Sequence, residues 1–401
     1  MKGTKIAAID VGTTKVCTIM ATSDSNSGIR VLGVGIAPSH GMEKGLVANI
    51  NQAKESIQES ISKAERMAGY KLESAYVGVT GRHISSLNNT GVVAITRQDQ
   101  LVRPADLRRV MDVALNVKSP VDRQLLHVIP RTYVLDGQEV RNPVGMHGYE
   151  LNVEAHIVTA SVASIQNLTK CIMRIGVNIE DLILEPLASA EAVLTEEEKQ
   201  AGVLVADIGG GTTDIAVIKD GSIYHTSVLP VAGHQVTHDI AVGLGLSFDL
   251  AEEMKKKYAT VMPTDETSDS DVPVNGDSHN ISSRELCDIV HARIEELIRL
   301  IVLELPRNDY GNIIPAGIVF TGGSANLPGI AELASEVTKL PTRIGVPVNL
   351  NGVSNNMLND PAYACSVGLL LWKERNQGAQ KWPIQPGGVR HFFDQVFKLF
   401  K

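Results

Sequence analysis

The sequence of 401 residues has few aromatic side chains and few cysteines, and it contains no long apolar run. Its four cysteines form no CxxC pair and no metal-like spacing, which favours reduced thiols over disulfide bonds or a zinc site. No run of 18 apolar residues occurs, and Asp10 interrupts the first apolar stretch, so we expect neither a membrane-spanning helix nor a signal peptide. The net charge of −8 argues against nucleic acid as the main partner.

One glycine-rich motif occurs twice, as IDVGTTK at residues 9–15 and as DIGGGTTD at residues 207–214. Each copy follows a short apolar run that is typical of a β-strand. Glycine lets backbone N–H groups approach phosphate oxygens, threonine hydroxyls add hydrogen bonds, and an aspartate at a strand end can orient a hydrated Mg²⁺. A duplicated α/β domain with a ligand in its central cleft would show this repeat, so the pair predicts one nucleotide site built from two halves.

Two later segments add predicted nucleotide contacts. Glu252 and Lys255, one helical turn apart, can reach a ribose or an adenine edge, although an i,i+3 surface ion pair explains the same spacing. A third glycine cluster, TGGSANLPG, leaves room for adenine against the backbone. The predicted Mg²⁺-orienting residues, through water, are Asp10 and Asp207. The predicted nucleotide-binding residues are Asp10, Gly12, Thr13, Thr14, Lys15, Asp207, Gly209, Gly210, Gly211, Thr212, Thr213, Asp214, Glu252, Lys255, Gly322, Gly323 and Ser324.

Glu185 is the catalytic candidate, because it precedes Pro186 where a strand pattern gives way to a helix pattern. A carboxylate at such a strand end would point into a cleft and polarise a water molecule. An acid favoured by the dipole at a helix start is the alternative explanation.

The chain alternates strand-like and helical patterns, as expected of an α/β protein. Residues 83 to about 160 differ from this pattern and look like an inserted α+β unit. Its histidines, His127, His147 and His156, match no usual metal spacing. Residues 263–280 are polar and read as a loop. Ser282 and Glu285 then form a capping-box pattern ahead of a long helix.

The C-terminus is rich in phenylalanine, with four of the six phenylalanines in the last ten residues. At 100° per residue, the apolar side chains of VRHFFDQVFKLFK fall within an arc of about 160°. Basic residues on the other side give the pattern of an interfacial helix on an anionic membrane, although docking on the protein's own core or on a partner remains an alternative. The predicted membrane contacts are Val389, Arg390, Phe392, Phe393, Val396, Phe397, Lys398, Phe400 and Lys401.

Together these segments resemble the superfamily of actin, DnaK-type chaperones and sugar kinases, and within it the FtsA family of bacterial cell-division proteins. The resemblance spans nearly the whole chain and includes HGMEKGLVANI, LDGQEVRNPVGMHG, AEEMKKKYA, HARIEEL, TGGSANLPG and DPAYACSVGLLL. One position departs from the family pattern: Ser324 stands where the adenosine motif usually has a third glycine. If that position needed positive φ, serine would cost on the order of 1 kcal/mol.

The resemblance implies an α/β, actin-like ATPase fold. It has two related RNase H-like α/β domains, an inserted α+β subdomain 1C, a subdomain 2B and a C-terminal amphipathic helix. The implied boundaries are 1–82, 161–200 and 361–376 for subdomain 1A, 83–160 for 1C, 201–242 and 311–360 for 2A, 243–310 for 2B, 377–388 for a linker and 389–401 for the membrane helix.

The resemblance also implies a function. ATP and Mg²⁺ would be the cofactors, with at most slow hydrolysis. The protein would polymerise on the cytoplasmic face of the cell membrane at the division septum, anchor the tubulin-like protein FtsZ and recruit later division proteins. Arg293 occupies the place where the acidic FtsZ C-terminal peptide would bind. The alternatives are an FtsA-like pilus-assembly protein and a soluble small-molecule kinase. A kinase is disfavoured because we find no separate sugar-binding segment or unassigned acid motif.

Overall fold

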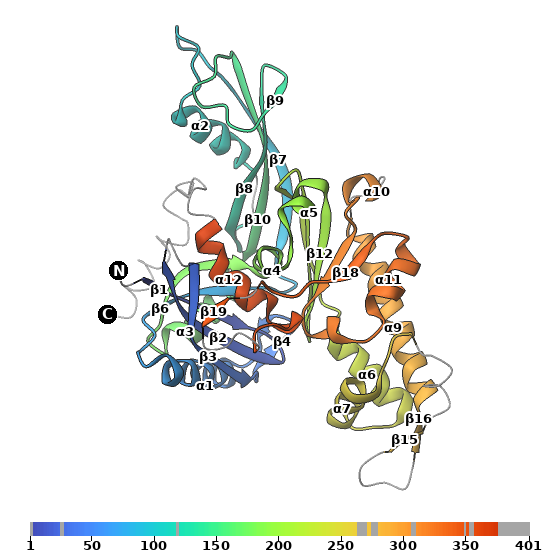
Figure 1. Cartoon of the computed structure of the whole chain (residues 1–401). Helices are drawn as coiled ribbons and strands as arrows, with labels where there is room; N and C mark the ends of the chain where they lie inside the picture. The colour runs from blue at the N-terminus through green and yellow to red at the C-terminus, as the bar shows by residue number, and fades with distance from the viewer. Residues whose placement is uncertain are drawn as a thin grey trace.

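The computed structural model describes residues 3–24, 28–117, 120–262, 271–273, 280–305, 310–348, 350–352 and 357–375. Two α/β halves lie side by side, and a third unit built on β7, β8 and β10 extends from their junction (Figure 1). The linker and the C-terminal amphipathic helix predicted from the sequence lie outside the described residues. No helix among the described residues is long and apolar enough to cross a membrane.

The first half is built on a six-stranded sheet in which the central strand β1 pairs with an antiparallel and a parallel neighbour. Apolar residues dominate β1 from Ile6 onward and are buried on both faces, because helices cover the sheet. Its strands, in spatial order, are β11 (Asn178–Leu184), β6 (Ser74–Val79), β1 (Thr4–Val11), β2 (Lys15–Asp24), β3 (Gly28–Pro38) and β19 (Asn351–Gly352).

Helix α1 (Ile50–Ala68) packs on β3 of the first sheet. The Asn49 side chain caps its first turn, and Gly69 ends it in the left-handed conformation, as the sequence pattern predicts. Helix α3 (Val162–Met173) packs on α1. A small hairpin of β4 (Met42–Glu43) and β5 (Leu46–Val47) precedes α1.

The second half repeats the arrangement of the first. Its central strand β12 also pairs with an antiparallel strand on one side and a parallel strand on the other. In spatial order the sheet contains β14 (Ser222–Leu229), β13 (Thr213–Lys219), β12 (Val203–Ile208), β17 (Ile318–Thr321) and β18 (Thr342–Ile344). The prediction of two related α/β halves is therefore confirmed.

Further helices complete the second half. The Ser282 side chain accepts a hydrogen bond from the N–H of Glu285, which confirms the predicted cap of α9. Within the predicted loop 263–280, the described residues 271–273 form the short strand β15, which pairs with β16; the polar composition gave no sign of this pairing. The elements are α5 (Glu196–Ala201), α6 (Gly233–Leu244), α7 (Phe248–Tyr258), β15 (Asp271–Pro273), β16 (Asn280–Ser282), α9 (Ser283–Leu303), α10 (Tyr310–Ile313), η1 (Gly323–Asn326) and α11 (Ile330–Thr338).

The inserted unit has a sheet and a hydrophobic core of its own, which includes Val110, Met111, Leu151 and Val153. Helix α2 (Pro104–Ala114) covers one face of the sheet. Its strands, in spatial order, are β7 (Ser85–Ala94), β10 (Glu150–Ser161), β8 (Arg123–Leu135) and β9 (Gln138–Val140).

Two helices cross at the junction of the halves. Helix α4 (Glu185–Val193) follows β11, and α12 (Ala364–Arg375) follows the short helix η2 (Pro361–Tyr363). They touch so closely that a Cβ atom added to Gly368 would lie 1.8 Å from the carbonyl oxygen of Ala188. Only glycine fits this crossing. The cysteines are all unpaired and buried, in agreement with the sequence analysis.

Candidate functional site

The two glycine-rich loops meet face to face between the halves. The first connects β1 to β2 and the second connects β12 to β13. A Cβ added to Gly210 would lie 2.4 Å from Thr14 Cγ2, and one added to Gly211 would lie 2.6 Å from Thr13 Oγ1. Glycine in the second loop therefore allows the close approach of the first loop.

Two adjoining cavities run through this junction and share Thr14, Gly209, Gly210 and Gly323. Thr213 lines neither, because its hydroxyl is buried and donates to the carbonyl of Val231 at 2.7 Å. The predicted residues that line the first cavity are Asp10, Gly12, Thr13, Thr14, Lys15, Glu185, Asp207, Gly209, Gly210, Gly211, Thr212, Asp214, Gly322 and Gly323. Glu252, Lys255 and Ser324 line the second.

Two buried aspartates lie near the ends of the central strands, each held by a serine hydroxyl. Ser366 of α12 donates to Asp10 Oδ2 at 2.6 Å, and Ser189 of α4 donates to Asp207 Oδ2 at 2.5 Å. Burial raises the pKa of Asp10, and it raises the pKa of Asp207 to about 6. Each crossing helix therefore fixes the aspartate of one phosphate loop.

Two more carboxylates, Glu185 and Asp214, face the same cavity. Burial raises the pKa of Glu185 well above its ordinary value, and the negative charges of Asp10 and Asp214 add to this effect. Burial also raises the pKa of Asp214 to about 7, although hydrogen bonds from Thr80 and Thr212 oppose the change. The site thus holds four acidic groups in a space where their ionised forms are costly.

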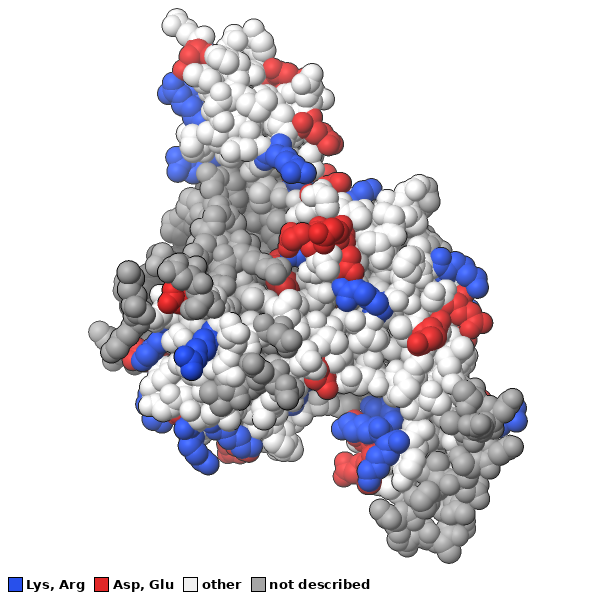
Figure 2. Space-filling model, viewed as in Figure 1, with Lys and Arg blue, Asp and Glu red and all other residues white. Residues whose placement is uncertain are grey.

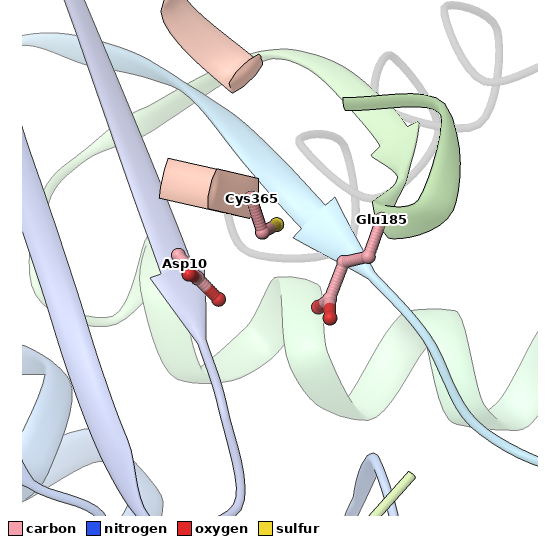
Figure 3. A group of neighbouring side chains, drawn as sticks. All are labelled: Asp10, Glu185 and Cys365. Atoms are coloured by element: carbon pink, nitrogen blue, oxygen red, sulfur yellow. The ribbon is translucent and has the colours of Figure 1, made fainter. Parts of the chain in front are cut away.

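Asp10, Glu185 and Cys365 form the one group of possible metal ligands found among the described residues, with their ligand atoms within 4.8 Å of one another. Figure 3 shows them entering one space from β1, α4 and α12. Burial raises the pKa of the Cys365 thiol well above its ordinary value, so the sulfur stays protonated. Carboxylate oxygens suit Mg²⁺ and a thiol does not, so the oxygen atoms are the relevant ligands. Predicted Asp207 lies outside this group.

Glu185 is the first residue of α4, so its backbone position also fits the alternative of an acid at a helix start. Its side chain, however, is buried in the cavity. A Cβ on Gly78 would lie 3.1 Å from Glu185 Cγ, so a side chain at this position of β6 would crowd the Glu185 side chain. This placement agrees with a water-polarising role, which stays a prediction.

Glu252 and Lys255 form the ion pair that their spacing suggested, with a distance of 2.6 Å between the Glu252 Oε2 and Lys255 Nζ atoms. The pair is not an ordinary surface pair, because Lys255 is buried and both residues line the second cavity. Figure 2 shows further basic side chains beside acidic ones on the outer face near α7, where Lys256 also pairs with Glu252 at 3.0 Å.

The turn after β17 places positive φ at its first glycine and not at the serine. Gly322 has φ 85°, whereas Ser324 lies in helix η1 and is not among the residues with positive φ. The cost of about 1 kcal/mol that serine would have at positive φ therefore does not arise at Ser324. Its hydroxyl donates to the carbonyl of Gly209 at 2.9 Å and so joins the adenosine motif to the second phosphate loop.

Arg293 lies outside both cavities, on α9. It is paired within the chain, to Asp239 of α6 at 2.5 Å and to Glu296 of the next helical turn. The predicted membrane residues, 389–401, lie outside the described residues.

Several residues of the site escaped the sequence analysis. Ser189, Ser366 and Thr80 each bind one of the buried aspartates, and each comes from a segment distant in sequence from its partner. Lys15 was predicted as a phosphate contact, yet its Nζ donates to the carbonyl of Ala362 at 2.6 Å. The segment DPAYACSVGLLL contains Ala362 and Ser366, so only its resemblance to the family, and no local signal, pointed to it.

Two family models match the chain. The model "Cell division protein FtsA" matches residues 204–368, and "SHS2 domain inserted in FTSA" matches residues 81–159. The second match covers β7, α2 and β8, and nearly all of β10.

Two proteins that are similar to this chain over most of their length are both named cell division protein FtsA. Cell division protein FtsA of Pseudomonas aeruginosa is 44% identical over 382 residues, which cover 94% of this chain and 90% of that protein. Cell division protein FtsA of Bacillus subtilis is 36% identical over 380 residues, which cover 93% of this chain and 84% of that protein.

Solved structures share the fold at low identity. A chain of the PilM–PilN type IV pilus biogenesis complex superposes with a TM-score of 0.62 at 16% identity, covering 91% of this chain and 97% of that one. MreB5 of Spiroplasma citri bound to AMPPNP superposes with a TM-score of 0.57 at 15% identity, covering 93% and 97%. These likenesses confirm the predicted actin-like fold, and the family matches go further: the chain belongs to the FtsA family of cell-division proteins.

Proposed function

We propose that the chain is an ATP-binding cell-division protein that polymerises on the cytoplasmic face of the cell membrane and anchors FtsZ there, and that later division proteins assemble on it. Membership of the FtsA family is the observation that carries this proposal. The meeting of two phosphate loops between two related halves supports the ATP-binding part of it.

We assign the phosphates to the cavity between the loops and the adenosine to the adjoining cavity. The backbone of residues 209–212 and the hydroxyls of Thr13 and Thr14 would bind phosphate oxygens. Lys255 and Glu252 line the adenosine side, where a ribose would exchange hydrogen bonds with them. The acidic cavity would then hold the triphosphate together with its metal ion, because four carboxylates would repel a triphosphate without one.

Mg²⁺ fits the acidic end of the cavity, because the groups there are buried oxygen ligands. Asp10 and Asp207 would hold it through water, and their serine partners would keep the carboxylates in place. When bound, the ion would neutralise phosphate charge and draw together groups from both halves. Glu185 would orient a water molecule toward the terminal phosphate, with slow hydrolysis as the expected outcome.

Two other functions competed with cell division: a role in pilus assembly and that of a soluble small-molecule kinase. The pilus protein resembles this chain at 16% identity, against 44% for the division protein of Pseudomonas aeruginosa. The difference favours cell division, and the predicted C-terminal amphipathic helix, which has no role in a kinase, favours it as well.

An acidic peptide copying the FtsZ C-terminus should bind the full-length protein, and Arg293→Glu should weaken that binding at least roughly tenfold, because it reverses a charge next to Asp239 and Glu296. Arg299→Glu is the matched control, since it changes an exposed arginine on the same helix that pairs only one turn away with Glu295. Isothermal titration of the three proteins measures the difference. No affinity for the peptide in the unchanged protein would count against the adaptor function.

The C-terminal helix should carry membrane binding. Phe393→Glu combined with Phe397→Glu places two charges on the predicted apolar face, so co-sedimentation with anionic liposomes should fall to the level seen without lipid. A matched variant, Asp394→Glu with Gln395→Glu, changes the polar face and should pellet more weakly than the unchanged protein but well above that level. Equal pelleting of all three proteins would contradict the membrane assignment.

A further inference from the structure

His127 accepts a hydrogen bond from the backbone immediately before the candidate catalytic residue, Glu185. The backbone N–H of Leu184 donates to His127 Nε2 at 3.0 Å. Leu184 caps α4, and the next residue is Glu185. Because Nε2 is the acceptor, the ring is neutral with its proton on Nδ1, and burial lowers the pKa of His127 to about 4. The bond therefore persists throughout the neutral pH range.

A local irregularity in β8 lies next to His127. Val158 of β10 pairs with His127, whereas Thr159 pairs with Leu125, so Leu126 is an extra residue in β8. Such a bulge turns the strand and redirects its side chains. Leu126 packs in the core of the first half, while Leu125 and Val128 pack against the core of the inserted unit. On both sides of His127, β8 therefore contacts both cores, since Ile129 also packs against the core of the first half.

The His127 ring also contacts the second crossing helix. Its centroid lies 5.7 Å from that of Trp372 on α12, with the planes at 55°. One side chain therefore touches both helices at the junction of the halves: α4 through a hydrogen bond to its cap and α12 through a ring contact. Those helices carry Ser189 and Ser366, which bind the two aspartates of the site.

The inserted unit is attached to the second half as well. His156 Nε2 lies 2.9 Å from the hydroxyl of Thr226 on β14, and Ser86 of β7 donates to the Thr226 carbonyl at 2.7 Å. The guanidinium of Arg131 lies 4.3 Å from the centre of the Tyr224 ring. The unit is inserted in the first half but bonded to the second, so any rotation between the halves must move it or break these contacts.

We propose that His127 is a positioning residue that couples the inserted unit to the nucleotide cavity by holding the backbone that carries Glu185. The proposal rests on the nucleotide binding proposed above. When ATP draws the halves together, β14 displaces the inserted unit, and β8 transmits the displacement through His127 to the start of α4. Coupling between two binding sites is reciprocal. The factor by which nucleotide changes the affinity of the inserted unit for a partner or a neighbouring subunit is therefore the factor by which that partner changes the affinity for nucleotide.

The test measures hydrogen–deuterium exchange of full-length proteins with and without the Mg²⁺ complex of AMPPNP. His127→Leu removes the acceptor, His127→Gln keeps one, and His147→Leu changes a histidine of the inserted unit whose ring bonds to the carbonyl of Asp99. Without nucleotide, the Leu184 amide should exchange roughly tenfold faster in His127→Leu than in the other proteins, because one hydrogen bond is lost.

With nucleotide, strands β7, β8 and β10 should change their exchange in the unchanged protein, in His127→Gln and in His147→Leu. In His127→Leu this response should disappear although nucleotide affinity, measured by titration, stays within about threefold. Thr226→Val combined with Ser86→Ala removes both hydrogen bonds at Thr226, although the contact between Arg131 and Tyr224 remains. This double variant should weaken the response while leaving the Leu184 amide protected, so the proposal stays testable even where His127→Leu does not fold.

Two results would overturn the inference alone: equal exchange of Leu184 in all variants, or a full nucleotide response in His127→Leu together with normal nucleotide binding. Absence of nucleotide binding by the unchanged protein would overturn the proposed function and the inference with it.

Discussion

Gly368→Ala should lower the free energy of unfolding by at least about 2 kcal/mol, because overpacking of this kind costs more than alanine gains in a helix. The added Cβ would lie 1.8 Å from the carbonyl oxygen of Ala188 and 2.3 Å from its carbonyl carbon. Both are backbone atoms of α4, which cannot move aside as the end of a flexible side chain can. Helices α4 and α12 would have to separate, and urea unfolding would measure the loss.

The separation of α4 from α12 should also disturb the proposed nucleotide site. Ser189 and Glu185 move with α4, and Ser366 moves with α12, so the aspartates would lose their fixed positions. We expect affinity for the Mg²⁺ complex of ATP to fall at least roughly tenfold, since the groups proposed to hold the metal are positioned from both sides of the crossing.

Gly243→Ala is the matched control for Gly368→Ala. Gly243 also lies within a helix, α6, and an added Cβ would meet only the end of the flexible Ile289 side chain, at 2.7 Å. Helix propensity alone would then make alanine neutral or stabilising by up to about 1 kcal/mol. Equal stability of the two variants would show that the helix crossing tolerates a methyl group and would contradict the prediction.

The phosphate loops were predictable from sequence because their signals are local. An apolar run, then aspartate, glycine and threonine, describes a strand and the turn that follows it, and Asp10 and Asp207 lie near the ends of those strands. The repetition of the motif added long-range information, because two related sheets place the corresponding turns at corresponding edges. The cap of α9 at Ser282 was predictable for the same local reason.

The residues that complete the site carry no local signal. Ser366 binds Asp10 across 356 positions of sequence, and a serine in an apolar helix looks like any small residue. His127 was considered only as a metal ligand, because its real partner is a backbone N–H that any residue could supply. The conditional cost at Ser324 failed to arise because the positive φ belongs to Gly322, two positions earlier.

The stability of the nucleotide-free protein should rise as the pH falls from about 8 to about 6, the alkaline limb of its pH profile, because buried carboxylates take up protons in the folded state. The folded-state pKa of Asp207 is raised from 3.8 to about 6 and that of Asp214 to about 7. Above these values the folded protein holds costly charges that the unfolded chain exposes to water. Lowering the pH from 8 therefore lets the folded state take up protons first, and its stability rises.

Buried histidines oppose this gain on the acidic side. Burial lowers the pKa of His83 and His127 to about 4 and that of His156 to about 3. Below about pH 6.5 the unfolded chain binds protons at these side chains and the folded protein does not, so the histidines offset the stability that the carboxylates add, and the profile should flatten. Chemical unfolding at half-unit pH steps from 5 to 8.5 would trace both effects.

Asp214→Asn isolates the alkaline limb. The amide has no charge but keeps only one of the two oxygens that accept from Thr80 and Thr212, so the variant should lose one hydrogen bond at every pH. Its stability relative to the unchanged protein should nevertheless rise from pH 6 to pH 8.5. The gain over this range should be about 1.4 kcal/mol, since only about one unit of the pKa shift of Asp214 lies above pH 6 and one unit corresponds to about 1.4 kcal/mol. Asp112→Asn, which changes an exposed carboxylate on α2, should show no such gain.

The Mg²⁺ complex of ATP should flatten the alkaline limb of the unchanged protein. A divalent cation beside Asp10 and Asp207 favours their ionised forms, so the folded state no longer loses stability as they ionise. The stabilisation by the complex should therefore increase from pH 6 to pH 8, whereas ATP in the presence of EDTA should stabilise the protein less at every pH. A ligand effect independent of both pH and metal would place the nucleotide away from the buried carboxylates.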